Sequence, residues 1–148
     1  MPTAFKPAVL AMLLAGLLAS NAASAAPSYT WKYRPLFVFA GGETSGLAAQ
    51  RSIVAAQATG FKERDIVVVW IVGDKVSADF GPTPGENPNT LRRRYGVGAG
   101  AFRAVLVGKD GGVKLSAASP LAASTLFTTI DAMPMRRDEV RRIRKNAG

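Results

Sequence analysis

The chain of 148 residues contains neither cysteine nor histidine. Histidine is the usual general base near neutral pH and a common metal ligand, and the cysteine thiolate is the usual thiol nucleophile. Without these residues, Ser–His and Cys–His nucleophile pairs, disulfide exchange, thiol-based peroxide reduction and ordinary zinc sites are excluded. We therefore expect no metal, no cofactor and no enzymatic activity.

Acidic residues are scarce: 10 Asp and Glu stand against 19 Lys and Arg, and the formal net charge is +9. The excess cations gather in two places, and the candidate residues for binding an anionic partner are Arg92, Arg93, Arg94, Arg136, Arg137, Arg141 and Arg142. Each cation near an anionic membrane contributes about 1 kcal/mol at moderate salt. The sequence thus predicts a salt-sensitive contact, with a solvated, solubilising tail as the alternative.

Long apolar runs are also lacking, apart from one near the N-terminus. Ala8–Ala19 is uniformly apolar but shorter than the about 20 residues that span a bilayer. Lys6 precedes it, and residues 23–25 (Ala-Ser-Ala) follow as a small-x-small cleavage site. We predict a signal peptide over residues 1–25 and a periplasmic or secreted chain with no transmembrane anchor after cleavage. Nucleic acid is then a poor partner.

The mature chain is organised as a leader, one domain and a tail. We place the leader at residues 26–34 and expect its first part, through Thr30, to be loose. The domain covers residues 35–133, and the basic C-terminal tail covers residues 134–148. The segment beyond Pro134 has few apolar residues, so we expect an exposed helix or a frayed end.

The first half of the domain alternates strand and helix. Leu36–Ala40 is a short apolar run that predicts a buried strand, and Thr44 or Ser45 can cap the helix that follows. Gly60 is expected to end that helix. Residues 66–72 (IVVVWIV) are typical of a strand covered on both faces.

The second half begins with a proline- and glycine-rich segment, residues 73–90, which predicts a long irregular loop. A short helix capped by Asn89 or Thr90 follows, and then a hairpin over residues 101–116. In its first strand, Val105 and Val107 are expected on one face, and Ala104 and Leu106 on the other.

A last helix starts with Ser119 as cap and Pro120 in its first turn, and Pro134 ends it. Its apolar residues fall on one face at three- and four-residue spacing, namely Ala122, Leu126, Phe127, Ile130 and Met133. The predicted order is β-α-β-α-β-β-α, an α/β fold with a central mixed sheet and helices on both faces.

Two glycine patterns fail as nucleotide motifs. Gly41–Gly46 has phosphate-loop spacing, but Leu47 stands where the lysine is required. Residues 96–101 (GVGAGA) precede a strand rather than a helix, which is the wrong context for a dinucleotide site. A weak anion-binding site remains an alternative where the first strand meets the first helix. The favoured interpretation is that these glycines permit a tight turn and close packing of the helix on the sheet. Asp74, Asp79 and Glu86 together could hold calcium loosely, but solvated turn residues are the favoured interpretation.

Several segments resemble a known family. They are YRPLFVFA, ERDIVVVWIVGD, LRRRYGVGAGAFRAVLVGKDGGVKL and LFTTIDAMPMRR, which together span Tyr33–Arg137. They are similar to a family of exported bacterial domains of unknown function, called P-DUDES (DUF4174), which also occurs in vertebrate extracellular-matrix proteins with sushi repeats. The resemblance implies a thioredoxin-like fold.

The resemblance also implies where a redox site would lie. Active thioredoxin-like proteins carry their cysteine where the first strand gives way to the first helix, here Ala40–Leu47, so Glu43, Thr44 and Ser45 occupy a vestigial active-site position. Thioredoxins place a cis-proline before the hairpin, where this chain has Gly98–Ala99–Gly100. We expect a looser backbone edge there.

Three functions remain for such a chain. The first is a non-enzymatic exported binding or scaffold module on a redox-dead thioredoxin-like fold, with an unknown protein partner that meets the Arg92–Arg94 surface, the long loop or the tail. The second is peripheral binding to anionic lipid or another anionic envelope component through the tail. The third is a carboxylate enzyme that uses Glu43 with Thr44.

Overall fold

The computed structural model of the protein describes residues 29–148, so the predicted signal peptide lies outside the described residues. The elements, in chain order, are β1 (Arg34–Ala40), α1 (Ser45–Ala56), α2 (Ala58–Glu63), β2 (Ile66–Val72), β3 (Lys75–Asp79), α3 (Pro88–Tyr95), β4 (Arg103–Val107), β5 (Val113–Ala117), α4 (Ala123–Asp131) and α5 (Pro134–Asn146).

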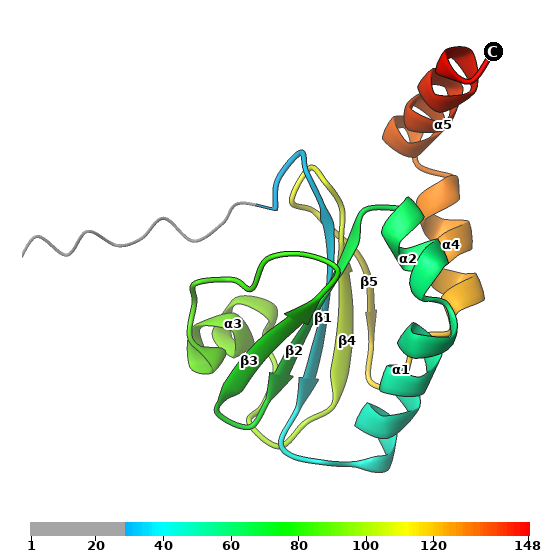
Figure 1. Cartoon of the computed structure of the whole chain (residues 1–148). Helices are drawn as coiled ribbons and strands as arrows, with labels where there is room; N and C mark the ends of the chain where they lie inside the picture. Colours follow the sequence, from blue (N-terminus) through cyan, green and yellow to red (C-terminus); the bar gives the residue numbers. More distant parts are fainter. Residues whose placement is uncertain (1–28) are drawn as a thin grey trace, which may run out of the picture.

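The strands form one five-stranded mixed sheet in the order β3-β2-β1-β4-β5. β1 pairs in parallel with β2 and antiparallel with β4, and the β2–β3 and β4–β5 pairs are antiparallel hairpins. Helices α1, α2 and α4 cover one face of the sheet and α3 covers the other, while α5 extends beyond α4 (Figure 1). The expected α/β class, with a mixed sheet between helices, is confirmed, and the arrangement is consistent with a thioredoxin-like fold.

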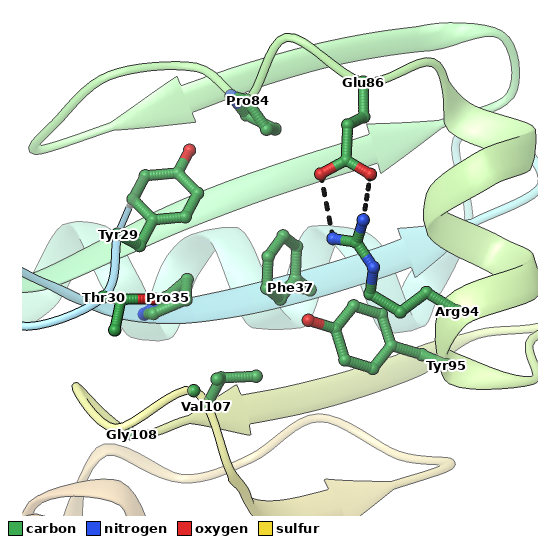
Figure 2. Close-up of a pocket in the computed structure, with 11 residues that line it drawn as sticks. Tyr29, Thr30, Pro35, Phe37, Pro84, Glu86, Arg94, Tyr95, Val107 and Gly108 are labelled. Atoms are coloured by element: carbon green, nitrogen blue, oxygen red, sulfur yellow. Dashed lines mark hydrogen bonds and ion pairs between the residues drawn. The ribbon is translucent and has the colours of Figure 1, made fainter. Parts of the chain in front are cut away.

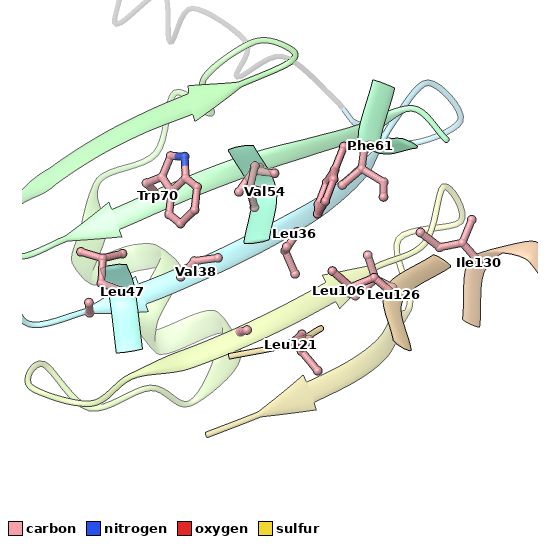
Figure 3. Close-up of a cluster of buried hydrophobic side chains, with 14 residues drawn as sticks. Leu36, Val38, Leu47, Val54, Phe61, Trp70, Leu106, Leu121, Leu126 and Ile130 are labelled. Atoms are coloured by element: carbon pink, nitrogen blue, oxygen red, sulfur yellow. The ribbon is translucent and has the colours of Figure 1, made fainter. Parts of the chain in front are cut away.

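Alternating side chains of the strands build two separate cores. On the first face, Leu36, Val38 and Leu106 pack against α1, α2 and α4, as Figure 3 shows. On the second face, Phe37, Phe39, Val105 and Val107 pack with Leu91 of α3 and other buried residues. The predicted alternation along the β4 hairpin is thus confirmed. The apolar run of β2 is covered on both sides, as expected.

The predicted long loop over residues 73–90 contains a strand, so that prediction was wrong. β3 forms a hairpin with β2, and Val76 and Ala78 alternate toward the second core. The alternation of apolar and polar residues in β3 is short and lies among turn-forming residues. The sequence pattern therefore did not indicate a strand. The remaining loop, residues 80–87, leads to α3. Asn87, rather than Asn89 or Thr90, caps this helix: its side chain accepts a hydrogen bond from the Thr90 N–H at 2.9 Å.

The first helical segment does not end at Gly60. It breaks at Gln57, and α2 continues to Glu63. Gly60 lies inside α2, where a Cβ would come within 2.7 Å of the Phe127 ring of α4. The glycine therefore permits close packing between helices and does not cap one.

The last helical segment also differs from the expectation. α4 begins at Ala123, and neither Ser119 nor Pro120 belongs to it. The buried Gln50 side chain fixes its start instead, because it accepts from the Leu121 N–H at 2.8 Å and donates to the Leu121 carbonyl at 3.0 Å. Pro134 is the first residue of α5. The tail therefore forms a helix, which is one of the two alternatives expected from the sequence.

Candidate functional site

The vestigial active-site position has the contacts of an ordinary helix start. Thr44 caps α1 by accepting a hydrogen bond from the Leu47 N–H at 3.3 Å, as predicted. Glu43 is exposed and forms an ion pair with Arg51 at 2.8 Å, and Ser45 is exposed at the first position of the helix. Since Glu43 has no buried ionisable neighbour in these contacts, the geometry gives no support to a carboxylate enzyme there.

The first glycine of this junction, Gly41, permits close packing. A Cβ on Gly41 would lie 2.9 Å from the Gly100 Cα and 3.2 Å from the Ala99 carbonyl oxygen. The segment after β1 thus meets the segment before β4 backbone to backbone. Within residues 29–148 there is no cis peptide bond, so no cis-proline edge is formed here.

The three arginines of α3 have three different environments. Arg92 is 7% exposed and donates to the Gly73 carbonyl at 2.6 Å, so it supports the β2–β3 turn and does not face a partner. Arg93 is exposed, and Arg94 forms a bidentate ion pair with Glu86. Only Arg93 and Arg94 of this predicted anion-binding group are available on the surface.

The arginines of the tail divide in a similar way. Arg136 is buried and donates to the Glu63 carbonyl at 3.0 Å, whereas Arg137, Arg141 and Arg142 are exposed along α5. Arg141 also forms an ion pair with Asp138. Because α3 and α5 lie on opposite sides of the molecule (Figure 1), the two arginine groups do not form one basic face.

A buried ionic network at the base of α5 was not anticipated from the sequence. Arg34 is 1% exposed and donates to Glu139 at 3.1 Å and to the Arg64 carbonyl at 2.9 Å. Lys109 bridges Glu139 at 2.7 Å and Asp65 at 2.8 Å. Burial raises the pKa of Glu139, but hydrogen bonds and charge from Arg34 and Lys109 outweigh it, so the pKa is lowered. Arg34 and Glu139 are 105 residues apart in the sequence, so no local sequence pattern predicts their contact.

A cavity of about 350 Å³ lies on the α3 side of the sheet, at the amino end of β1. It lies between the turn that precedes β1, the 80–87 loop, the end of α3 and the β4–β5 turn (Figure 2). The lining residues are Tyr29, Thr30, Pro35, Phe37, Pro84, Glu86, Arg94, Tyr95, Val107, Gly108 and Gly111.

Aromatic rings form much of this cavity. The Phe37 ring lies 5.0 Å from that of Tyr95 and 6.3 Å from that of Tyr29, measured between centroids. The Tyr29 hydroxyl donates to the Pro82 carbonyl at 2.5 Å, which ties the chain before β1 to the 80–87 loop. The prediction of a loose leader was therefore wrong for Tyr29 and Thr30, since packing and this hydrogen bond hold them.

The charged groups of the cavity neutralise each other. Arg94 donates to Glu86, with one of the two hydrogen bonds at 2.8 Å, and this hydrogen bond raises the pKa of Arg94. Burial raises the pKa of Tyr95 and, together with the Glu86 charge, that of Tyr29. Both hydroxyls therefore stay protonated at neutral pH. The cavity offers flat apolar surface beside a fixed donor and a fixed acceptor, which suits binding of a small ligand.

The acidic residues near the loop do not form the calcium site considered above. Asp79 accepts a hydrogen bond from Trp70 Nε1 at 2.8 Å, and Glu86 is bound to Arg94. Within the described part of the chain, no three acidic residues come together in a metal-binding group. The partner of Asp79 is thus an indole, and the partner of Glu86 is a cation.

Comparison with known proteins gives one match. The model of a domain of unknown function, DUF4174, matches residues 26–139, which include the whole sheet, the cavity and Glu139. No curated protein and no solved structure matches the chain. In residues 29–148, no helix has the length and apolar character needed to cross a membrane.

Proposed function

The chain belongs to the DUF4174 family, and from this premise we propose that it is a non-enzymatic, exported binding module on a redox-dead thioredoxin-like fold of the P-DUDES type. Its ligand or partner segment enters the cavity between the 80–87 loop and the end of α3. The sequence analysis offered three surfaces for a partner, and two of them, the loop and the α3 arginines, meet in this cavity through Glu86 and Arg94.

The cavity is the observation that carries this proposal. Its volume lies in the range of about 300–1,000 Å³ that is typical of small-ligand sites, and its walls combine aromatic rings with the polar groups of Thr30, Glu86, Arg94 and the two tyrosines. Its one carboxylate, Glu86, is held by Arg94, which favours recognition over proton transfer. The chain has no thiol or imidazole to supply other catalysis.

Arg94→Ala tests the proposal, with Arg93→Ala as the matched control on the same helix. Two-dimensional ¹H–¹⁵N spectra of the protein are recorded with neutral oligosaccharides, small organic anions, amines and a proline-rich peptide. We expect at least one class to shift signals of cavity residues such as Tyr29 and Tyr95. Loss of a charged hydrogen bond should weaken that binding by about 10- to 100-fold in Arg94→Ala, and Arg93→Ala should leave it within about twofold.

Two results would contradict the proposal. One is that no class of solute shifts the signals of the cavity. The other is that Arg94→Ala binds as tightly as the unmodified protein.

Peripheral binding to an anionic envelope component remains the second candidate function. It is favoured by α5, which extends from the domain as a continuous helix and carries exposed cations beyond the region matched by the family model, namely Arg141, Arg142, Arg144 and Lys145. No residue of α5 lines the cavity, and α5 lies far from α3 (Figure 1), so both functions can exist in one chain.

A further inference from the structure

Trp31 is an aromatic residue whose placement is not explained by folding. Its side chain is 66% exposed, although tryptophan is usually well buried. Its backbone lies in the left-handed region, with φ of 67°, which is unfavourable for a bulky side chain. Neither burial nor backbone preference therefore accounts for tryptophan here, and strain of this kind is often found at functional sites.

The surrounding turn, Tyr29–Tyr33, holds Trp31 beside the cavity. The Trp31 N–H donates to the Lys109 carbonyl at 2.7 Å, and the Lys32 and Tyr33 N–H groups donate to the Tyr29 carbonyl at 3.0 and 2.8 Å. Tyr29 and Thr30 line the cavity, as do Gly108 and Gly111 on the β4–β5 turn. Trp31 itself does not line the cavity, but its exposed indole extends from a backbone that these hydrogen bonds fix next to the rim.

We propose that the cavity and Trp31 together bind a neutral oligosaccharide, an inference that rests on the binding function proposed above. A sugar ring has apolar C–H faces and an edge of hydroxyls that both donate and accept hydrogen bonds. One ring stacks on the exposed face of Trp31, and the adjoining ring enters the cavity among the tyrosines. There its hydroxyls donate to free lone pairs of Glu86 and accept from Arg94.

Charge and hydrogen bonding favour a neutral saccharide over a charged ligand and over a proline-rich peptide. A charged ligand would compete with the Glu86–Arg94 ion pair, whereas a neutral polyol can bind to both members without separating them. A proline-rich peptide also suits aromatic surfaces, but proline has no N–H to donate to Glu86. A neutral saccharide satisfies the aromatic and the polar groups together.

The chain carries its own reporter for this test. It has two tryptophans, and Trp70 is 5% exposed on the opposite face of the sheet, with its Nε1 bound to Asp79. Fluorescence changes on binding at the rim will therefore come from Trp31. The probes are neutral tetrasaccharides of β-linked glucose and of β-linked N-acetylglucosamine. An anionic uronic-acid tetrasaccharide and a decamer of proline are tested alongside.

We expect a saturable shift of the tryptophan emission to shorter wavelength with at least one neutral tetrasaccharide. Trp31→Ala should raise the Kd, measured by calorimetry, at least tenfold, and Trp31→Phe should restore most of the affinity. Ile143→Ala, which removes another exposed large apolar side chain (61% exposed) on α5, should leave the Kd within twofold. Far-ultraviolet circular dichroism of each variant checks folding.

Other outcomes overturn the inference. If only the uronic acid or the proline decamer binds at the cavity, the binding function stands and the saccharide assignment is wrong. If a neutral tetrasaccharide binds but Trp31→Ala has the same Kd, the role of the rim tryptophan is wrong. If none of the four probes binds and the broader solute panel leaves the cavity unshifted, both proposals fail.

Discussion

Glu139 accepts hydrogen bonds from two cations that the base of the sheet buries, Arg34 from β1 and Lys109 from the β4–β5 turn. Without this carboxylate, the 1% exposed Arg34 would keep only the Arg64 carbonyl as a partner. A buried cation left with too few partners is costly. One acidic side chain in an arginine-rich segment therefore fixes the second turn of α5 to the domain.

Glu139→Gln should destabilise the protein by about 3 kcal/mol at pH 7, as expected for breaking a buried pair in which Lys109 keeps Asp65 as partner. Asp138→Asn, which alters the neighbouring exposed pair with Arg141, should cost less than about 0.5 kcal/mol. Urea unfolding measures both. Equal stabilities of the two variants would show that the network does not hold α5.

The same carboxylate predicts a pH dependence. Its folded-state pKa is lowered, so its contribution is complete above the unfolded value of about 4.3 and is lost as the pH falls through the folded-state pKa. The difference in stability between the unmodified protein and Glu139→Gln should therefore shrink below about pH 4. Urea unfolding at a series of pH values measures this difference, and one that stays constant down to pH 3 would contradict the assignment.

At the scale of elements, the close approach of Gly41 to Gly100 joins the segments that follow β1 and precede β4. Gly41→Ala would place a Cβ 2.9 Å from backbone, which cannot rotate away, and should destabilise the protein by about 1–3 kcal/mol. Gly42→Ala is the matched control, because its Cβ would meet nothing within 4 Å. Thermal or urea unfolding compares them, and a Gly41→Ala variant as stable as Gly42→Ala would show that the contact is unimportant.

The periodicity of apolar residues was sufficient to predict the helices and strands whose side chains pack into one or both cores. The β2 run, the alternation along β4 and the Leu126–Ile130 face of α4 were all predicted from apolar spacing. The prediction was wrong where a tertiary contact decides the boundary. Gly60 packs against Phe127 inside α2 rather than ending a helix. Gln50 binds Leu121, just before α4, although the two residues are 71 positions apart in the sequence. Both contacts join residues that are far apart in the sequence, so neither could be predicted from local sequence patterns.

The candidate site depended even more on tertiary structure. The sequence singled out Arg94 as a cation and the 73–90 segment as a partner surface, but not the pairing of Arg94 with Glu86 over an aromatic floor. The cavity combines residues from the turn before β1, from β1 itself, from a loop, from a helix and from a hairpin. Each of these contributes only two or three residues, so no single segment is long enough to carry a motif.

Across the whole molecule, α3, the β1–α1 junction and α5 lie in different places (Figure 1), and the cavity takes none of its lining residues from the junction or from α5. This separation matters for testing α5. Removing the entire tail would also remove Arg136 and Glu139, which hold the base of the domain. Loss of binding in such a variant would not distinguish loss of charge from loss of folding.

Truncation after Val140 avoids that ambiguity. It removes four exposed cations, Arg141, Arg142, Arg144 and Lys145, and keeps the ionic network intact. At about 1 kcal/mol for each cation near an anionic surface, sedimentation with vesicles containing phosphatidylglycerol should show binding weakened by about 100- to 1,000-fold at low salt. The unfolding free energy should change by less than about 0.5 kcal/mol, because every side chain removed is exposed.

The full-length protein should itself lose vesicle binding as salt is raised toward about 0.5 M, because screening shortens the range of these charges. Arg93→Ala, on the far side of the sheet, should bind vesicles as the unmodified protein does. If the truncated chain binds as tightly as the full one, α5 is not an anionic-surface contact, and the proposal for this helix fails while the cavity proposal is unaffected.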